Sequence, residues 1–178
     1  KNIQVIQCGG VRGKNGINKK ESDELIRVIC EMVESQHGLD SDYSQTIGVT
    51  TPFRQQADYL QELILNEMSV ESVQKHNILV GTPYSFQGEE RDIMLISFVL
   101  DQKSSASAMR YMNQSDVFNV MITRARVKQI IFLSTDENQV SPDSLLGSYF
   151  LYLRAYYNES PNCGLSQLPK SAELVYDS

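Results

Sequence analysis

One run of residues restricts the fold more than any other part of the sequence. Residues 93–99 read IMLISFV, which is apolar at odd and even positions alike except for Ser97. A strand with one face in water alternates apolar and polar side chains, so this run is typical of a strand covered on both faces, at the centre of a parallel sheet. The sequence therefore predicts an α/β fold with helices on both sides of the sheet.

Shorter apolar runs and helical patterns predict the rest of the fold. Further strands are expected at residues 3–6, 47–49, 78–80 and 130–133. Apolar residues recur at helical spacing in three segments, which are expected to be helices: 19–36, 53–68 and 145–157. Strands that alternate with helices in this way predict a three-layer fold with right-handed crossovers.

Local signals predict where helices begin and where loops lie. Asn18 and Glu21 have the spacing of a helix-capping pair, and that helix is expected to end near residues 37–38. The hydroxyl of Thr51 is expected to cap the next helix, with Pro52 at its first position. The Ser-rich segment 101–114 is expected to be a mobile loop.

The glycine-dense segment 8–16 invites comparison with a phosphate-binding loop. It lacks the G-x-x-x-x-G-K-[ST] frame, because Cys8 stands where the first glycine would be and Asn15 follows Lys14. We therefore expect a flexible surface loop. The histidines, His37 and His76, have no neighbouring ligand set and are expected at the surface.

Composition limits the functional classes. The net charge of −6 over 178 residues argues against nucleic-acid binding by the whole surface, although residues 117–129 carry three basic side chains and no acid. No apolar run approaches the roughly 20 residues of a membrane span. Three cysteines without metal-ligand spacing indicate free thiols in a reducing compartment, the cytoplasm, or the nucleus of a eukaryote. The chain begins at Lys1, which favours a segment of a longer protein.

Three polar segments, 51–56, 82–91 and 119–126, are expected at or next to the carboxyl ends of the strands, where open α/β sheets bind ligands. The last contains Arg124 and Arg126, whose planar guanidinium groups suit phosphate. The alternative is a helix whose basic last turn complements the helix dipole.

Together these segments resemble consecutive motifs of superfamily 1 helicases. The strings are TPFRQQ at 51–56, FQGEERD at 86–92 and NVMITRAR at 119–126. They are similar to the branch that contains the nonsense-mediated-decay RNA helicase and the nuclease-helicases of DNA replication. The resemblance implies a RecA-like parallel sheet flanked by helices on both faces, the second of two such domains, at residues 1–158. Residues 159–178 are expected to form an extended or poorly ordered tail.

The resemblance implies a nucleotide side of the domain. Arg124 matches the arginine that reaches the γ-phosphate of ATP, and Gln87, Gly88 and Glu90 match the motif whose acid contacts the ribose. Asn119 and Thr123 are expected to support the arginine helix. On their own chemistry, Gln87 and Glu90 remain open to plainer roles, as a turn amide and a solvated charge.

The resemblance also implies a side that faces a single strand of nucleic acid. Thr51, Pro52, Phe53 and Thr82 match positions on that track. Arg126 is open between a phosphate contact, a brace for the loop around Glu90 and a plain surface cation. The family commonly has Val-Asp where this chain has Pro83-Tyr84, and often has an arginine where this chain has Val117.

The sequence contains neither a phosphate-binding Gly-Lys-Thr/Ser loop nor an acidic pair for Mg²⁺. The resemblance assigns both to an upstream RecA-like domain, so the expected cofactor is ATP with Mg²⁺ and the expected partners are that domain and single-stranded DNA or RNA. The chain alone is expected to be inactive and to hold no metal. A non-catalytic RecA-like binding module is the main alternative. A small-molecule α/β enzyme is weaker, because Glu89, Glu90 and Asp92 have no base partner.

Overall fold

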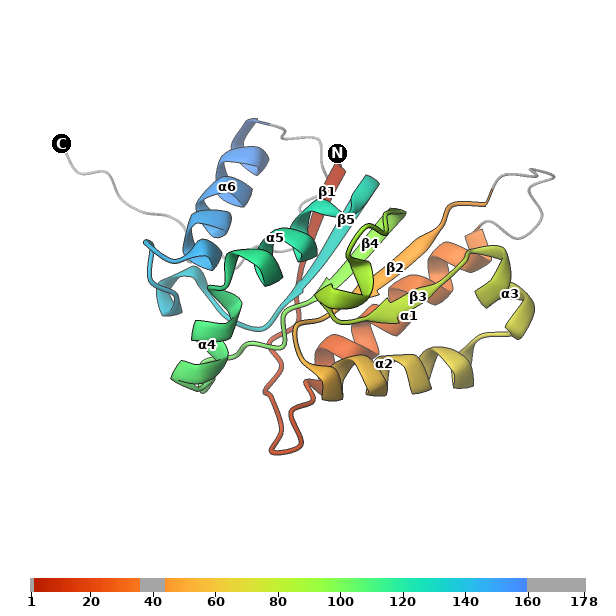
Figure 1. Ribbon diagram of the computed structural model, residues 1–178, viewed down its shortest axis with the longest axis horizontal. Helices are drawn as coiled ribbons and strands as arrows, with labels where there is room; N and C mark the ends of the chain where they lie inside the picture. Colours follow the sequence, from red (N-terminus) through yellow and green to blue (C-terminus); the bar gives the residue numbers. More distant parts are fainter. Residues whose placement is uncertain (1, 36–43, 160–178) are drawn as a thin grey trace.

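A parallel five-stranded sheet forms the centre of the molecule. The computed structural model describes residues 2–35 and 44–159. The strands are β1 (Asn2–Gln7), β2 (Ile47–Thr50), β3 (Leu79–Gly81), β4 (Arg91–Ser97) and β5 (Ala125–Leu133), in the order β1-β5-β4-β2-β3. All neighbouring pairs are parallel. Figure 1 shows the twisted sheet with its helices.

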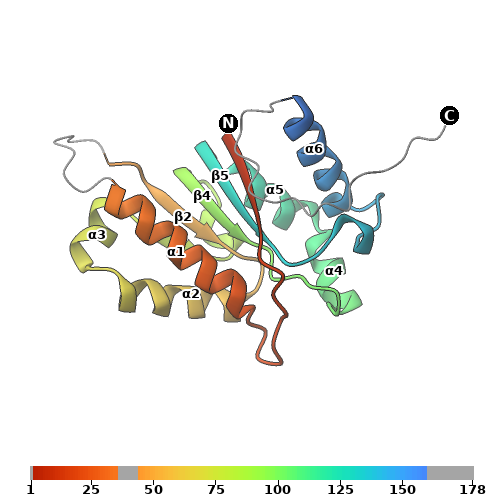
Figure 2. The ribbon, with the colours of Figure 1, turned by 180° about the vertical axis from the view of Figure 1, so that it is seen from behind.

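Helices cover both faces of the sheet, as the sequence predicts. On one face lie α1 (Lys19–Ser35) and α2 (Arg54–Glu67), seen in front of the strands in Figure 2. On the other lie α4 (Ala106–Met112), α5 (Ser115–Thr123) and α6 (Leu145–Glu159). The short helix α3 (Val70–Lys75) leads into β3, and two 3₁₀ turns, η1 (Pro83–Phe86) and η2 (Glu137–Gln139), complete the fold. None of the helices in the described ranges has the length and apolarity that crossing a membrane requires.

The apolar run at 93–99 is the central strand, which confirms the prediction made from it. All seven residues of β4 are buried, between β2 and β5. Ile93 and Leu95 pack with side chains of α1 and α2. Ile96 packs on the opposite face with side chains of α4, α5 and α6. Because both faces of this strand are covered, apolar side chains occupy consecutive positions and do not alternate with polar ones.

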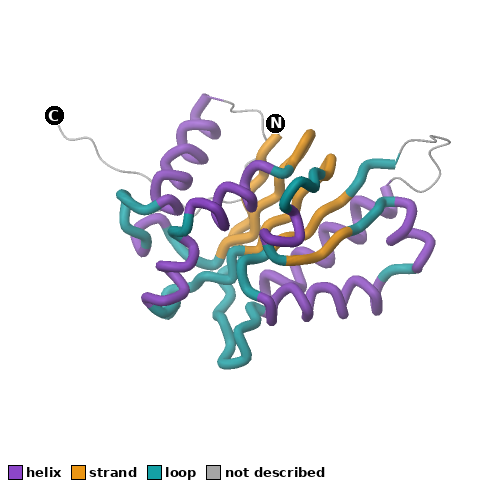
Figure 3. The backbone as a smooth tube through the Cα atoms, viewed as in Figure 1, coloured by secondary structure: helices purple, strands orange, loops and turns teal. Residues whose placement is uncertain are grey.

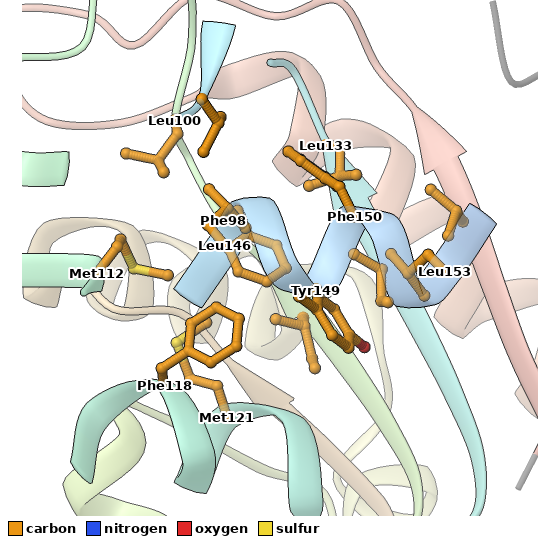
Figure 4. Close-up of a cluster of buried hydrophobic side chains, with 14 of the residues drawn as sticks. Phe98, Leu100, Met112, Phe118, Met121, Leu133, Leu146, Tyr149, Phe150 and Leu153 are labelled. Atoms are coloured by element: carbon orange, nitrogen blue, oxygen red, sulfur yellow. The ribbon is translucent and has the colours of Figure 1, made fainter. Parts of the chain in front are cut away.

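The aromatic residues of α6 pack mainly into the core. Tyr149 meets Phe118 edge to face with ring centroids 5.6 Å apart, and Phe150 is also buried. Figure 4 shows Tyr149 beside Phe118 of α5, and Phe150 on the other side of α6, beside Leu133. Packing is thus the role of Tyr149 and Phe150, while Tyr152 stays 52% exposed and stacks on Tyr149.

The predicted cap of α2 is wrong. The helix begins at Arg54, and Phe53 occupies the N-cap position without a side-chain hydrogen bond. The N–H of Thr51 instead donates to the carbonyl of Gly81, so this residue prolongs the pairing of β2 with β3. Its hydroxyl is buried and has no hydrogen-bond partner among the described residues. By contrast, the Asn18–Glu21 pair at the start of α1 is confirmed, since Asn18 Oδ1 accepts from the N–H of Glu21.

Part of the expected mobile loop at 101–114 is helical. Helix α4 is capped by Ser105, whose Oγ accepts from the N–H of Ala108, and Ala108 and Met112 are buried one turn apart. The serines around it obscured this short amphipathic pattern. His76 is also not at the surface: it is 1% exposed, and its Nδ1 lies 3.0 Å from the carbonyl oxygen of Gln45. His37, the expected end of α1 near residues 37–38, and residues 160–178 lie outside the described ranges.

The glycine-dense loop at 8–16 is anchored. The N–H of Gly10 donates to Ser134 Oγ, and the N–H of Arg12 donates to Asp101 Oδ2 at 2.7 Å. The loop projects below the sheet in Figure 3 and is largely exposed, so its predicted place at the surface is confirmed, and these bonds anchor it to the segments that follow β4 and β5. Cys8 and Cys30 are free and half-buried, and burial raises the pKa of Cys8 to about 12.

A buried carboxyl group joins the elements that meet at the carboxyl ends of the strands. Glu21 Oε2 accepts from Ser97 Oγ at 2.6 Å and from the N–H of Val99 at 2.9 Å. Its Oε1 accepts from Asn18 Nδ2. Gln56 of α2 donates to Ser97 Oγ, so that α1, α2 and the end of β4 share one network. Val99 has a φ of 64°, a strained conformation for a β-branched residue, and the bond to Glu21 helps to hold it.

Burial raises the pKa of Glu21 from its ordinary value of 4.5 to about 7, although the hydrogen bonds from Ser97, Ser134 and Val99 lower it. The folded chain therefore binds this proton more tightly than the unfolded chain does. The resulting stabilisation is complete below about pH 4.5 and is lost as the pH rises through about 7. The shift corresponds to on the order of 3 kcal/mol.

We predict that the free energy of unfolding falls between about pH 5 and 7.5 and that Glu21→Gln flattens this fall, because the amide cannot ionise. Urea unfolding followed by circular dichroism at several pH values measures it. The readout is the slope of the unfolding free energy against pH, not its absolute value. The amide of Gln replaces one hydrogen-bond acceptor by a donor, so Glu21→Gln is expected to be less stable at every pH. Glu34→Gln, at an exposed position of the same helix, is the matched control. Equal slopes in wild type and Glu21→Gln would contradict the prediction.

Candidate nucleotide and nucleic-acid surfaces

The residues singled out by the sequence divide between opposite edges of the sheet. Thr51, Pro52 and Phe53 follow β2 and Thr82 follows β3, so they lie at the carboxyl edge. Glu90 and Arg124 directly precede β4 and β5, which places them at the amino edge, where these strands start at the top of Figure 1. The expectation that all three segments gather at the carboxyl ends is therefore corrected. The chain returns to the amino edge before each strand, as the connection of parallel strands requires.

The end of helix α5 holds the side chain of Arg124. The hydroxyl of Thr123 donates to the carbonyl of Asn119 at 2.7 Å and accepts from Arg124 Nε at 3.2 Å. Asn119 and Thr123 thus support the arginine, as expected. Arg124 is half-buried, and no carboxylate of the described residues lies within ion-pair distance of it. A guanidinium in this setting can bind an external anion through its remaining N–H groups.

Arg126 braces the loop before β4. Its Nε donates to Glu90 Oε2 at 3.2 Å, and its Nη1 lies 4.0 Å from Asp92 Oδ1. Of the roles left open for Arg126, this contact is the one the structure contains. It also shows that Glu90 is an ion-paired group and not simply a solvated charge. Both side chains are about half exposed, at 56% and 50%, so the pair adds less than about 1 kcal/mol to stability.

Arg91 supports the same loop and was not anticipated. Its side chain is buried, and its Nη1 donates to Glu89 Oε2 at 2.8 Å and to the carbonyl of Glu90 at 2.9 Å. Its Nε donates to the carbonyl of Asn77. The sequence signal that could have found Arg91 is its place two residues before the apolar run that starts at Ile93. Because Arg91 N–H also donates to the carbonyl of Arg124, the loop before β4 and the end of α5 are held together.

Residues 87 and 88 form the exposed tip of this loop. Gly88 has a φ of 79°, and a Cβ added there would meet no atom within 4 Å. Glycine is therefore favoured by backbone conformation and not by lack of space. The N–H of Gln87 closes η1 on the carbonyl of Tyr84. The exposed side chains of Gln87 and Glu90 are accessible to a ligand at this edge.

At the carboxyl edge, only part of the expected track offers side-chain surface. Thr51 and Pro52 are buried, whereas Phe53 and Thr82 are half-buried. The hydroxyl of Thr82 makes no capping bond to η1, which leaves it available to a phosphate. Val117, which stands where the family often has an arginine, is buried in the core with Phe118.

The acidic residues near Arg124 do not assemble a metal site. Glu89 pairs with Arg91, Glu90 pairs with Arg126, and Asp92 Oδ2 accepts from the N–H and hydroxyl of Thr46. Within residues 2–35 and 44–159, no group of three or more histidine, cysteine or acidic side chains is arranged to hold a metal ion.

Comparison with known proteins identifies the family of the chain. The AAA domain family model matches residues 5–136. The chain is 30% identical over 135 residues to the RNA helicase Mov10l1 of Homo sapiens, covering 68% of this chain and 10% of that protein. It is 28% identical over 132 residues to the DNA replication ATP-dependent helicase/nuclease JHS1 of Arabidopsis thaliana, covering 73% and 9%. It is 24% identical over 119 residues to the ATP-dependent helicase upf1 of Schizosaccharomyces pombe, covering 67% and 12%.

The chain spans about a tenth of the length of these relatives. Its matched segment contains β2 to β5, η1, the loop before β4 and helix α5, and therefore the candidate residues of both edges. The chain belongs to the AAA domain family, as a superfamily 1 helicase domain of the nonsense-mediated-decay and replication helicase branch.

Proposed function

We propose that this chain is the C-terminal motor domain of an ATP-dependent helicase or translocase, which completes an ATP site on an upstream RecA-like domain. The observation that carries the proposal is Arg124: its Nε is fixed by Thr123, and no carboxylate of the described residues neutralises it. A pre-positioned guanidinium of this kind stabilises the charge that develops on a transferred phosphoryl group.

The residues around Arg124 suit the rest of a nucleotide. The carboxylate of Glu90 can accept a hydrogen bond from a ribose hydroxyl, and Arg126 orients it from behind. The tip at Gln87 and Gly88 is exposed beside it. Mg²⁺, when bound with ATP, would neutralise phosphate charge, and its ligands would come from the upstream domain, because the acids of this edge are already paired. The chain alone would therefore not hydrolyse ATP.

Nucleic acid would bind at the other edge. Phe53 and Thr82 offer a half-buried ring and a hydroxyl there, which fit the sugar–phosphate backbone of a single strand of DNA or RNA. The segment from Thr82 to Glu90 crosses from one edge to the other through η1, and Phe86 anchors it in a cluster with Met94 and Ala125. One short, packed segment would thus link nucleic acid to nucleotide, in a protein of the cytoplasm or, in a eukaryote, the nucleus.

The first prediction from this proposal concerns Arg124→Ala in the full-length protein. We expect kcat for ATP hydrolysis to fall by about 10³-fold or more, because transition-state charge loses its partner, while affinity for single-stranded nucleic acid stays within twofold. Steady-state turnover and fluorescence anisotropy measure the two effects. Arg27→Ala, on α1 and paired only with Glu24 and Glu31 in the described part, is the control. Unchanged turnover in Arg124→Ala would favour a non-catalytic binding module.

The second prediction separates the two arginines. Arg126→Ala should raise KM for ATP about three- to tenfold and leave kcat within about threefold, because Glu90 keeps its chemistry and loses only its orientation. Arg126→Lys should recover part of the loss, since an ammonium can still pair with the carboxylate. The same kinetic series measures it. A fall in kcat as large as that of Arg124→Ala would mean that Arg126, too, acts on the reacting phosphate.

A further inference from the structure

A connected run of aromatic and cationic side chains crosses the carboxyl edge beyond the residues already assigned. The Arg12 guanidinium carbon lies 3.8 Å from the centroid of the Phe53 ring. Phe53 in turn meets Tyr111 of α4, with ring centroids 6.0 Å apart. Burial raises the pKa of Tyr111, and the neighbouring hydroxyl of Tyr84 in η1 adds to this effect, so the two phenol groups lie close together. We call these four residues the edge strip. It brings together four segments that are far apart in the sequence.

Arg12 is held in place and makes no salt bridge with a described residue. Burial lowers the pKa of its guanidinium, and the charge of the nearby Asp101 partly offsets that change. The backbone N–H of Arg12 donates to Asp101 Oδ2, and its Nε donates to the carbonyl of Gly16 at 3.3 Å. Asp101 is buried, and its Oδ1 accepts from the N–H of Lys103 and from Ser104 Oγ. The carboxylate is therefore committed to loop backbone and a serine hydroxyl. The flat guanidinium rests on Phe53 with its outer nitrogens uncommitted among the described residues.

A pocket beside Arg12 has the character of an anion site. Its volume is about 270 Å³. The cations that line it are Arg12, Lys14 and Lys103, and the committed Asp101 is its one acid. Two serines, Ser104 and Ser105, add hydroxyl groups. The chain has a net charge of −6, so three cations around one pocket make this part of the surface unusually positive. A positive pocket favours the binding of a phosphate group.

Tyr84 lies at the other end of the edge strip and is 55% exposed. Its exposed phenol ring presents a face that can stack on a base. Thr82, two residues earlier, belongs to the proposed track. The edge strip therefore adjoins the track at Phe53 and again beside Thr82.

We propose that the edge strip extends the single-strand track: Arg12, with Lys14 and Lys103, binds a backbone phosphate, and Tyr84 stacks on a base. This inference rests on the proposed function, because it takes single-stranded nucleic acid as the ligand. The binding is independent of sequence, since neither group reads a base edge. Tyr111 acts as a positioning residue for Tyr84, and Phe53, besides its place in the proposed track, supports the guanidinium of Arg12.

The proposed contact between Arg12 and a backbone phosphate is tested with Arg12→Ala in the full-length protein. Anisotropy titrations of labelled oligo-dT and oligo-U at several salt concentrations give the affinity and its salt slope. We expect about fivefold weaker binding and a slope reduced by about 0.7, the value for one phosphate contact on a single strand. Lys75→Ala removes an exposed cation from α3 and should change neither quantity. Values for Arg12→Ala that match those of Lys75→Ala would overturn the phosphate contact.

The proposed stacking of Tyr84 on a base is tested with Tyr84→Ala and Tyr84→Phe. The alanine variant should weaken binding by about fivefold or more with an unchanged salt slope, because stacking involves no counterion release. The phenylalanine variant keeps the ring and loses only the hydroxyl that faces Tyr111, so its affinity should lie much closer to that of wild type than to that of Tyr84→Ala. Tyr152→Ala, which removes a tyrosine of similar exposure from α6, is the control. Equal affinity of Tyr84→Ala and wild type, or loss in Tyr84→Phe alone, would overturn the stacking role.

The experiments distinguish a failure of the edge strip from a failure of the proposed motor function. If wild type binds single strands and both Arg12→Ala and Tyr84→Ala bind equally well, the edge strip is refuted while the motor function stands. If wild type binds neither oligonucleotide, both are refuted. Inorganic phosphate at matched ionic strength separates a strand site from a simple anion pocket. Competition by millimolar phosphate that is abolished by Arg12→Ala would replace the strand with a free anion as the ligand.

Discussion

The buried hydrogen bonds of Glu21 hold together the edge on which the rest of the structure depends. This carboxyl group accepts from Asn18, Ser97 and Val99, and Asn18 reaches on to Ser134 beyond β5. Gly10 packs so closely on the side chain of Asn18 that a Cβ would overlap it. The loop that carries Arg12 is therefore shaped by the same network that ends the central strand. A buried polar network of this kind fixes one arrangement because every alternative leaves polar atoms unpaired.

The opposite edge depends on arginines in three different environments. Arg91 is buried and holds the loop from within, Arg126 is exposed and pairs with Glu90, and Arg124 makes no ion pair with a described residue. Residue type alone does not separate them. The contacts of each side chain separate them. A guanidinium that is already paired with a carboxylate binds a further anion weakly, whereas one held only through Nε can still bind an anion.

The layers of the fold and the helicase family could be predicted from the sequence, but the edge of the sheet on which each segment lies could not. The run at 93–99 was sufficient for a central strand, and the string at 119–126 was sufficient to single out Arg124. Thr51 was misassigned because its N–H pairs with Gly81, 30 positions away in the chain. Arg12 was missed because its place over Phe53 depends on Asp101. Periodicity and capping report on neighbours within a few residues, and these contacts lie beyond that range.

The segment between Thr82 and Glu90 has a thermodynamic consequence. It is anchored midway by Phe86, carries a residue of the proposed track at one end and ends at the acid that Arg126 orients. Two ligands that bias one packed element obey reciprocity: the factor by which bound nucleotide changes the affinity for a strand equals the factor by which the strand changes the affinity for nucleotide. A substitution at Phe86 that alters the packing of this segment would therefore change the coupling by the same factor in both directions, from strand to nucleotide and from nucleotide to strand.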